Sequence, residues 1–259
     1  MSILFQKYNG AGNDFIMIDN RDHHFDASNT PLIKQLCTRH FGVGADGLIL
    51  LENADGYDFK MVYFNSDGKE STMCGNGGRC IIRFAHDLKI IGTKTRFIAI
   101  DGIHLGKVLK DVISLQMQNV SAIDENDIRT ELNTGSPHYV AFMDEIPTTT
   151  FVNEARAVRE NEPYTKEGIN VNFAKVTNNQ IEMRTFERGV EDETLACGTG
   201  ATAVAIAAHK RSLITTNSIP IIVKGGKLNV SFEATENGYE NIWLTGPAEF
   251  VFEGNFTAK

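Results

Sequence analysis

The chain carries the same short pattern twice, almost half its length apart. Cys74-Gly75-Asn76-Gly77-Gly78 and Cys197-Gly198-Thr199-Gly200-Ala201 each precede a helix-like run, and the two cysteines lie 123 positions apart (197 minus 74) in a chain of 259 residues. The residues around both patterns agree at the same offset: Glu70 with Glu193, Ser71 with Thr194, Ala85 with Ala208 and His86 with His209. Such self-similarity predicts an internal duplication with two pseudo-symmetric halves.

Each pattern places a cysteine at the expected start of a helix. The first N–H groups of a helix have no partner within it, and together with the helix dipole they favour an anion. A thiolate there has a lowered pKa and can act as a base or nucleophile. Inert burial is the alternative for any single cysteine. Glycine-flanked cysteines in both halves of a repeat favour the functional interpretation for Cys74 and Cys197, whereas Cys37 and Cys80 fit apolar helix faces in the core.

The composition is that of an ordinary globular protein with an acidic balance. The formal net charge is -8, with 25 Lys and Arg against 33 Asp and Glu, which argues against nucleic acid or an anionic membrane as the main partner. The sequence shows neither a membrane-spanning apolar segment nor a signal peptide. Four cysteines do not make a disulfide framework, and none has zinc-finger spacing. We expect free thiols in a reducing cytoplasm, with no metal.

The pattern of apolar residues predicts an α/β chain of the α+β kind. In the first half, buried strands are expected at 16–19 and 47–52, and a helix from Thr30 to about His40. A further strand, in which Phe59, Met61 and Tyr63 alternate with outward positions, should end at Asn65. Short strands should follow the first cysteine-led helix to about residue 117.

The second half should repeat this order. Asn178-Asn179 separates two strand-like runs, 171–176 and 181–187, as a hairpin turn would. The helix after Cys197 is apolar on all sides, which is typical of a buried helix. This helix is therefore expected at the centre of its domain, wrapped by a sheet. The expected domains are 1–118 and 119–246, with a C-terminal strand at 247–259 returning to the first.

Further polar residues each allow two interpretations. Glu187-Arg188 could be a solvated pair on a turn, or Arg188 could bind a substrate carboxylate while Glu187 takes an ammonium group. Turn chemistry explains Asn13 and its neighbour Asp14 as well as substrate contact does. The glycine patterns lack the ending of a phosphate-binding P-loop. Asn65, Asn76 and Asn170 suit turns or strand ends, and His86 and His209 lie too deep in their helices to reach the cysteines.

The chain as a whole resembles the diaminopimelate epimerases, a family of amino-acid epimerases that use no pyridoxal phosphate. The resemblance runs nearly end to end, and its most specific part is the pair of cysteine patterns with Glu-Arg-Gly ahead of the second. It is carried by the segments at 7–15, 39–47, 64–68, 74–80, 135–138, 170–173, 187–189, 196–200 and 246–248.

The resemblance implies two similar domains, each a curved, mainly antiparallel sheet around a central helix, with a substrate between them. It also implies conversion of L,L- to meso-diaminopimelate for lysine and peptidoglycan synthesis in the cytoplasm of bacteria. It implies that Cys74 and Cys197 are the base and acid, with no cofactor. Further roles follow from the family pattern. N–H groups for the carboxylate at the reacting centre would come from Gly75, Asn76, Gly198 and Thr199. Asn13 and Glu187 would lie beside the reacting centre. The amino-acid group at the other end of the substrate would be held by Asn65, Asn170 and Arg188. A homodimer is the expected assembly.

The chain departs from the family pattern at three places. Ser136 stands where many members have Asn, and Gly47 where many have Gln. The stretch 190–195 is one residue longer than in some members. These departures concern the fit of the substrate more than the chemistry of the two cysteines.

Other functions on the same scaffold remain alternatives. A racemase of another amino acid, such as proline or histidine, would use paired cysteines but would not need a clamp for a second amino-acid head. A non-catalytic amino-acid sensor would bind the substrate without exchanging its α-proton. Exchange of that proton therefore discriminates between a sensor and an enzyme.

Overall fold

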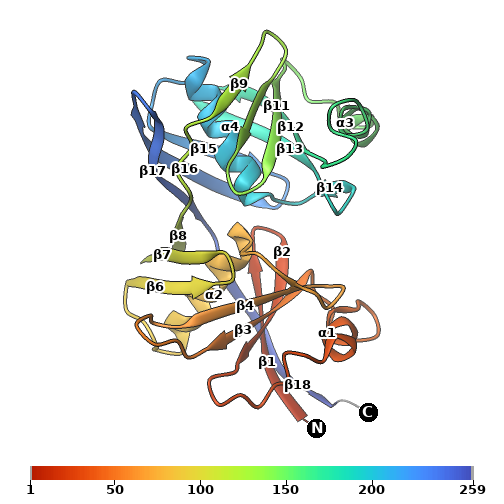
Figure 1. Ribbon diagram of the computed structural model, residues 1–259, viewed down its shortest axis with the longest axis vertical. Helices are drawn as coiled ribbons and strands as arrows, with labels where there is room; N and C mark the ends of the chain where they lie inside the picture. The colour runs from red at the N-terminus through yellow and green to blue at the C-terminus, as the bar shows by residue number, and fades with distance from the viewer. Residues whose placement is uncertain (1, 258–259) are drawn as a thin grey trace. The chain divides into compact units, whose positions relative to one another are not determined.

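The computed structural model describes residues 2–257 of the chain (Figure 1). The chain divides into two compact units, Met1–Leu115 with Gly246–Lys259, and Gln116–Thr245. The first unit contains, in chain order, β1 (Ser2–Gly10), β2 (Asn13–Asp19), α1 (Thr30–Cys37), β3 (Gly47–Glu52), β4 (Lys60–Asn65), β5 (Glu70–Ser71), α2 (Gly75–Asp87), β6 (Lys94–Ala99), β7 (Gly102–Leu109), β8 (Val112–Gln116) and the last strand, β18 (Glu249–Thr257).

The second unit is built from the middle of the chain. It contains β9 (Ile123–Glu125), β10 (Thr130–Asn133), β11 (Pro137–Phe142), α3 (Phe151–Arg159), β12 (Asn170–Thr177), β13 (Gln180–Glu187), β14 (Asp192–Thr194), α4 (Gly198–Lys210), β15 (Ser218–Val223), β16 (Gly226–Thr235) and β17 (Gly238–Gly246).

The two units share one topology. In the first, β2 and β3 are parallel and joined through α1, β3 pairs antiparallel with β4, and β4 lies parallel to β6. In the second, β11 and β12 are parallel and joined through α3, β12 pairs antiparallel with β13, and β13 lies parallel to β15. In both, the cysteine-led helix follows the short strand β5 or β14. The expected internal duplication and mixed α and β fold are confirmed.

One helix in each unit is buried against the sheet. Helix α2 packs on β1, β2, β3, β7 and β18, and α4 packs on β10, β11, β12, β13, β15 and β16. Every residue from Ala201 to Ala208 is buried, as the apolar sequence of that helix predicts. Because these helices are surrounded by strands, burial rather than helix propensity holds their first turns in place.

A second, shorter helix covers the other face of each sheet. Helix α1 buries Ile33, Leu36 and Cys37 in a cluster that also contains Val62 and Phe64 of β4. The expected outward positions in this strand are therefore wrong, because α1 covers the face that would otherwise meet solvent. The helix also ends at Cys37 rather than near His40, which has a positive φ of 73°.

The hairpin in the second unit forms where the sequence predicts it. Strands β12 and β13 pair from Val171 with Phe186 to Thr177 with Gln180. Asn178 and Asn179, between them, have φ values of 51° and 58°. Asparagine tolerates this left-handed conformation better than most residues, and two successive positive φ values match the twist of the flanking strands.

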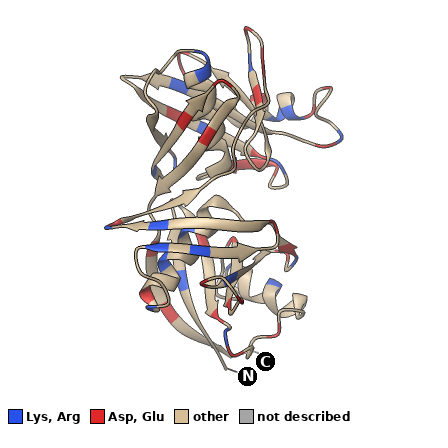
Figure 2. Cartoon of the chain, turned by 60° about the vertical axis from the view of Figure 1, so that its left-hand side comes forward, with Lys and Arg blue, Asp and Glu red and all other residues tan. Residues whose placement is uncertain are grey.

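Acidic and basic residues are interspersed on the strands and loops of each unit (Figure 2). Among residues 2–257, no helix is long and apolar enough to cross a membrane.

Gly47 marks a close approach between β3 and β4 that leaves no room for a side chain. A Cβ there would lie 2.6 Å from the Phe64 carbonyl oxygen and 2.6 Å from the Tyr63 ring. We expect Gly47→Ala to lower the free energy of unfolding by about 1–3 kcal/mol, as overpacking does. Gly92→Ala is the control, because a Cβ at Gly92 meets nothing within 4 Å. Urea unfolding measures both, and equal midpoints for the two variants would contradict the expectation.

Candidate active site

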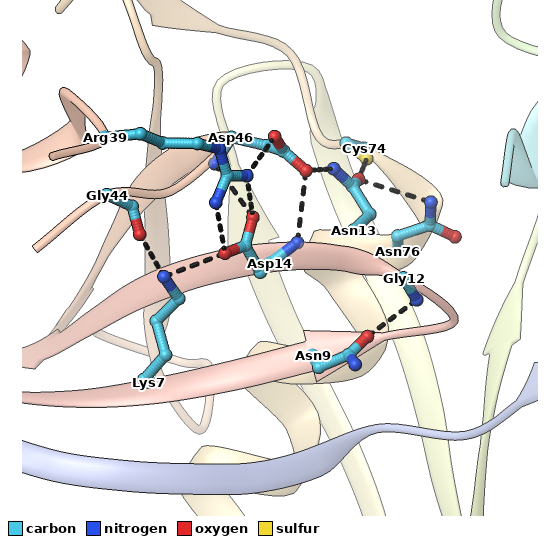
Figure 3. Close-up of polar contacts among 10 residues, drawn as sticks. All are labelled: Lys7, Asn9, Gly12, Asn13, Asp14, Arg39, Gly44, Asp46, Cys74 and Asn76. Atoms are coloured by element: carbon cyan, nitrogen blue, oxygen red, sulfur yellow. Dashed lines mark hydrogen bonds and ion pairs between the residues drawn. The ribbon is translucent and has the colours of Figure 1, made fainter. Parts of the chain in front are cut away.

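The first cysteine site is built around the start of α2. Cys74 is the N-cap of this helix, with extended backbone angles, and Gly75 and Asn76 are buried in its first turn. The Cys74 Sγ lies 3.7 Å from Asn13 Oδ1, and Asn76 Nδ2 donates to the same oxygen at 3.2 Å (Figure 3). The structure thus brings together four residues that the sequence singles out: Cys74, Gly75, Asn76 and Asn13.

Asn13 is held from the other side by a cluster of charged residues. Its Nδ2 donates to Asp46 Oδ2, and Asp46 accepts from Arg39 at 2.9 Å. Arg39 also binds Asp14 at 2.6 Å, and Lys7 binds Asp14 at 2.8 Å. Burial opposes ionisation of Asp14, but its bonds to Arg39 and Lys7 outweigh burial and lower the pKa of its carboxyl group. The Asp14 carboxylate therefore stays charged between Arg39 and Lys7, and these bonds fix the β1–β2 turn.

A fully buried arginine lies behind the first turn of α2. The Arg79 guanidinium donates to Asn76 Oδ1 at 3.0 Å and to the Gly75 carbonyl at 3.2 Å. It also reaches the backbone oxygens of Gly10 and Pro247. Burial lowers the pKa of Arg79, and this effect is opposed by the cysteines beside it. A side chain with five fixed donors thus ties the helix start to the β1–β2 turn.

The second cysteine site lies at the start of α4. Cys197 is the N-cap, and its Sγ accepts a hydrogen bond from the Gly200 N–H at 3.4 Å. The Thr199 hydroxyl is 3.4 Å from the same sulfur. Thr134 donates to the Thr199 carbonyl at 2.8 Å. Gly198 is buried at the first helical position, so that Cys197, Gly198 and Thr199 lie together, as the sequence predicts.

The predicted clamp residues of the second unit also meet. The Arg188 N–H donates to Asn170 Oδ1 at 2.9 Å, and Asn170 Nδ2 donates to Ser136 Oγ at 2.8 Å. The Arg188 guanidinium approaches the same hydroxyl at 3.4 Å and donates to the Glu167 carbonyl at 3.0 Å. These bonds orient a cation at the end of β13, where it can receive a carboxylate.

A buried histidine connects this clamp to the interior. His138 Nδ1 lies 3.1 Å from Asn172 Nδ2, and its Nε2 lies 3.5 Å from Asn170 Nδ2. Burial, with a smaller contribution from Arg188, lowers the pKa of His138 to about 3. The imidazole is therefore neutral. Asn172 Oδ1 would lie 2.7 Å from a Cβ on Gly200, so the same network packs closely under the start of α4.

Two predicted site residues, Asn65 and Glu187, form backbone hydrogen bonds within turns. Asn65 ends β4 opposite Gly47, and its backbone bonds to Lys69 and Gly68 close the following turn. The carbonyl of Glu187 accepts the N–H groups of Val190 and Glu191. For both residues, these backbone bonds fit the turn chemistry that the sequence also allows.

Several residues that shape these sites were not singled out as site residues from the sequence. Asp46, Arg39, Arg79, Thr134 and His138 bond other side chains or the backbone near the cysteines. The duplication offers one signal: Ser136 and Thr202 occupy the positions that correspond to Asn13 and Arg79 at the offset of 123. A charged or amide residue in one half that is replaced by another residue type at the offset of 123 indicates a position where the two cysteine sites differ.

The remaining cysteines belong to the core. Burial raises the pKa of both Cys37 and Cys80 to about 12, so neither is a thiolate at neutral pH. The histidine of the second long helix also has a packing role, since His209 bonds the Tyr239 hydroxyl at 3.0 Å. Within the part of the chain that the structure describes, no group of three or more His, Cys, Asp or Glu residues is placed to hold a metal ion.

Comparison with known sequences points to one family. A family model described as diaminopimelate epimerase matches residues 5–112 and 130–251. The diaminopimelate epimerase of Flavobacterium psychrophilum is 56% identical over 249 residues, which cover 95% of this chain and 97% of the relative. That of Aquifex aeolicus is 37% identical over 275 residues and covers 98% of each chain.

Solved structures share the fold at low sequence identity. A phenazine biosynthesis protein of the PhzF family from Bacillus anthracis superimposes with a TM-score of 0.75 at 12% identity, covering 100% of both chains. A probable proline racemase from Agrobacterium radiobacter K84 gives a TM-score of 0.67 at 13% identity, covering 99% of this chain and 93% of that one. These likenesses support the duplicated fold.

The neutral His138 predicts a loss of stability in acid. An unfolded histidine gains a proton below about pH 6.5, whereas the folded His138 gains one only near pH 3. Between these values the unfolded state binds more protons than the folded state. The free energy of unfolding therefore decreases by up to about 1.4 kcal/mol for each unit by which the pH is lowered. We expect His138→Asn to have a shallower slope in urea unfolding between pH 6.5 and 4. The exposed His23→Asn is the control, and an unchanged slope in His138→Asn would contradict the expectation.

Proposed function

Because this chain belongs to the diaminopimelate epimerase family, we propose that it converts L,L-diaminopimelate to meso-diaminopimelate in lysine and peptidoglycan precursor synthesis. The observation that carries the proposal is the cysteine at the N-cap of a buried helix in each of two duplicated units. Each unit, with the division expected near residue 118, contributes one cysteine to the reaction. The proposal needs no cofactor, because the protein itself stabilises the charge.

The proposed reaction is a proton exchange between two thiol groups through the substrate. One of Cys74 and Cys197 is a thiolate and removes the α-proton, so that the electron pair remains on the substrate as a carbanion. The other is a thiol and gives its proton to the opposite face, which inverts the centre. The first cysteine ends as a thiol and the second as a thiolate, and proton exchange with solvent returns the starting state.

The carbanion requires stabilisation at the α-carboxylate, where its negative charge spreads. We assign this role to the N–H groups of Gly75, Asn76, Gly198 and Thr199, which lie in the first turns of α2 and α4. A helix terminus contributes about 0.3–1 kcal/mol when exposed and up to about 2 kcal/mol when partly buried. Preorganised hydrogen bonds and exclusion of water must therefore supply most of the rate enhancement.

Diaminopimelate has a second amino-acid group, at the end that does not react, and this group also needs binding residues. We propose that Arg188 binds the far carboxylate, and that Asn65 and Asn170 complete its clamp. Ser136 supports this clamp through its bonds to Asn170 and Arg188. Asn13 and Glu187 are proposed to lie beside the reacting centre.

Gly47 gives no polar group to this site. Because a Cβ there would meet the Phe64 carbonyl at 2.6 Å, the Gln of many family members would require β3 and β4 to shift. The glycine at position 47 therefore affects the packing of β3 against β4 as well as the polar groups of the site.

The assembly and partners are proposed from the exposed residues and the net charge. We propose a homodimer in the bacterial cytoplasm that acts on a small amino acid and binds neither nucleic acid nor membrane. The outer surface of β18 supports the dimer, because Phe250, Val251 and Phe252 are 49%, 53% and 44% exposed. A contiguous exposed apolar strand of this kind is typical of a surface that a second copy covers. The net charge of -8 supports the absence of polyanionic partners.

The two-cysteine mechanism predicts that each cysteine is indispensable. Cys74→Ser and Cys197→Ser should each lower kcat/KM for epimerisation by about 10²–10⁴-fold, because one proton-transfer group is lost. The measurement is incubation with L,L-diaminopimelate in D2O, followed by chiral separation and mass analysis of α-deuterium. Cys37→Ala is the control and should retain activity. Near-normal turnover of either serine variant would refute the mechanism, and no exchange by the unmodified, folded protein would refute the function.

If Arg188 binds the far carboxylate, its substitution should change KM more than kcat. Arg188→Lys keeps the charge but loses the two-pronged geometry that suits a carboxylate. We expect KM to rise about 10-fold to 100-fold, in line with a lost charge-assisted hydrogen bond of about 1.5–3 kcal/mol, with a smaller change in kcat. Arg21→Lys, in an exposed pair with Asp19, is the control. An unchanged KM in Arg188→Lys would remove Arg188 from the clamp.

A further inference from the structure

The turn that carries Arg188 is closed by a residue in an unfavourable backbone conformation. This turn consists of residues 188–191 and joins β13 to β14. The N–H groups of Val190 and Glu191 donate to the Glu187 carbonyl at 3.2 and 2.8 Å. Glu191 has a φ of 57°, in the left-handed region that glycine and asparagine tolerate better than glutamate does. Contacts around Glu191 must therefore hold it in this conformation.

Helix α3 supplies such contacts through two arginines in its last turn. Arg159 donates to Glu191 Oε1 at 3.4 Å, and Arg156 donates to the Glu191 carbonyl at 3.3 Å. The same carboxylate oxygen accepts the Gly189 N–H at 3.0 Å, within the turn. The helix is itself anchored, because its Phe151 side chain is fully buried among residues of β12 and β13. Glu191 thus ties the turn to a fixed element through both its side chain and its backbone.

Arg159 also holds the loop that binds the Arg188 guanidinium. Its Nη1 donates to the Tyr164 carbonyl at 3.1 Å, and the Gly168 N–H donates to the same oxygen at 2.9 Å. The Arg188 guanidinium donates to the Glu167 carbonyl, in that loop, at 3.0 Å. One arginine side chain therefore contacts both segments on which the position of Arg188 depends.

Arg159 and Arg188 lie against the same glycine. A Cβ on Gly168 would lie 2.7 Å from Arg188 Cδ and 2.9 Å from Arg159 Nη2. Because the two side chains meet at one α-carbon, a shift of Arg159 would displace Arg188. The bond between Arg159 and the Glu191 carboxylate opposes such a shift.

We propose that Glu191 is a positioning residue for Arg188: its carboxylate, held by Arg159, fixes the turn so that the Arg188 guanidinium can receive the far carboxylate of the substrate. This inference rests on the proposed function and deepens it. Glu191 acts through the Gly189 N–H and Arg159 and does not touch the substrate. It lies in the stretch 190–195, where the chain departs in length from some members of the family, so this role belongs to the turn of the present chain.

The variant Glu191→Gly separates positioning from stability. Glycine adopts a φ of 57° without strain, so relief of the backbone opposes the loss of a half-exposed ion pair, and the urea midpoint should change little. We expect KM for L,L-diaminopimelate to rise about 5-fold to 10-fold with little change in kcat, a size typical of contacting residues that act together. The control is Glu145→Gly, which removes an exposed ion pair with Lys175 in the same unit and should leave KM unchanged.

Two further variants test whether Glu191 acts through Arg188. Glu191→Gln keeps an oxygen that can accept from Gly189 and Arg159, so most of the rise in KM should disappear. An equal rise in Glu191→Gln and Glu191→Gly would mean that the carboxylate binds the substrate's ammonium group directly, and would overturn the positioning role. In an Arg188→Ala background, Glu191→Gly should cause no further loss of kcat/KM, and a further loss of the same size would also overturn it.

Direct binding distinguishes this inference from the function it rests on. Titration calorimetry with meso-diaminopimelate measures affinity independently of α-proton exchange. Weaker binding to Glu191→Gly, together with no exchange by the unmodified protein in D2O, would support the positioning role and refute the proposed enzyme. Epimerisation by the unmodified protein with an equal KM in Glu191→Gly would refute the positioning role and leave the function intact. A folded protein that neither binds diaminopimelate nor exchanges its α-proton would refute both.

Discussion

Burial of one helix against the sheet of each unit is the constraint on which the candidate site depends. Helices α2 and α4 are held by strands on several sides, so their first turns cannot fray as an exposed helix end would. The backbone N–H groups of those turns are then fixed in a poorly solvated place. A cysteine at the N-cap and glycines in the first turn make that place suitable for an anion, and the proposed chemistry depends on this packing.

The two units keep one architecture but have diverged in the polar groups around their cysteines. Asn13 in the first unit contacts Cys74, whereas Ser136, at the corresponding position, supports Asn170 and Arg188 instead. A symmetric pair of sites could not distinguish the two ends of a substrate. At these positions the first unit places an amide beside its cysteine, whereas the second holds Asn170 and Arg188, the residues of the proposed clamp.

The sequence predicts most of the secondary structure, because the periodicity of apolar residues and the turn residues are local signals. The hairpin at Asn178 and Asn179 and the strand at Gly47–Glu52 form as predicted. The outward faces of β4 are not predicted, because whether Val62 meets solvent depends on α1, which packs on it from an earlier part of the chain. Local patterns do not reveal what covers a second face.

The sequence by itself determined the duplication, the two cysteine-led helices and the family to which the chain belongs, since repeats and motifs are properties of residue order. Only the tertiary structure decided which way the polar groups around Cys74 point. Asp46 and Asn13 are 33 positions apart and meet through one hydrogen bond. The direction of an amide depends on partners that are adjacent in space, and no spacing along the chain specifies them.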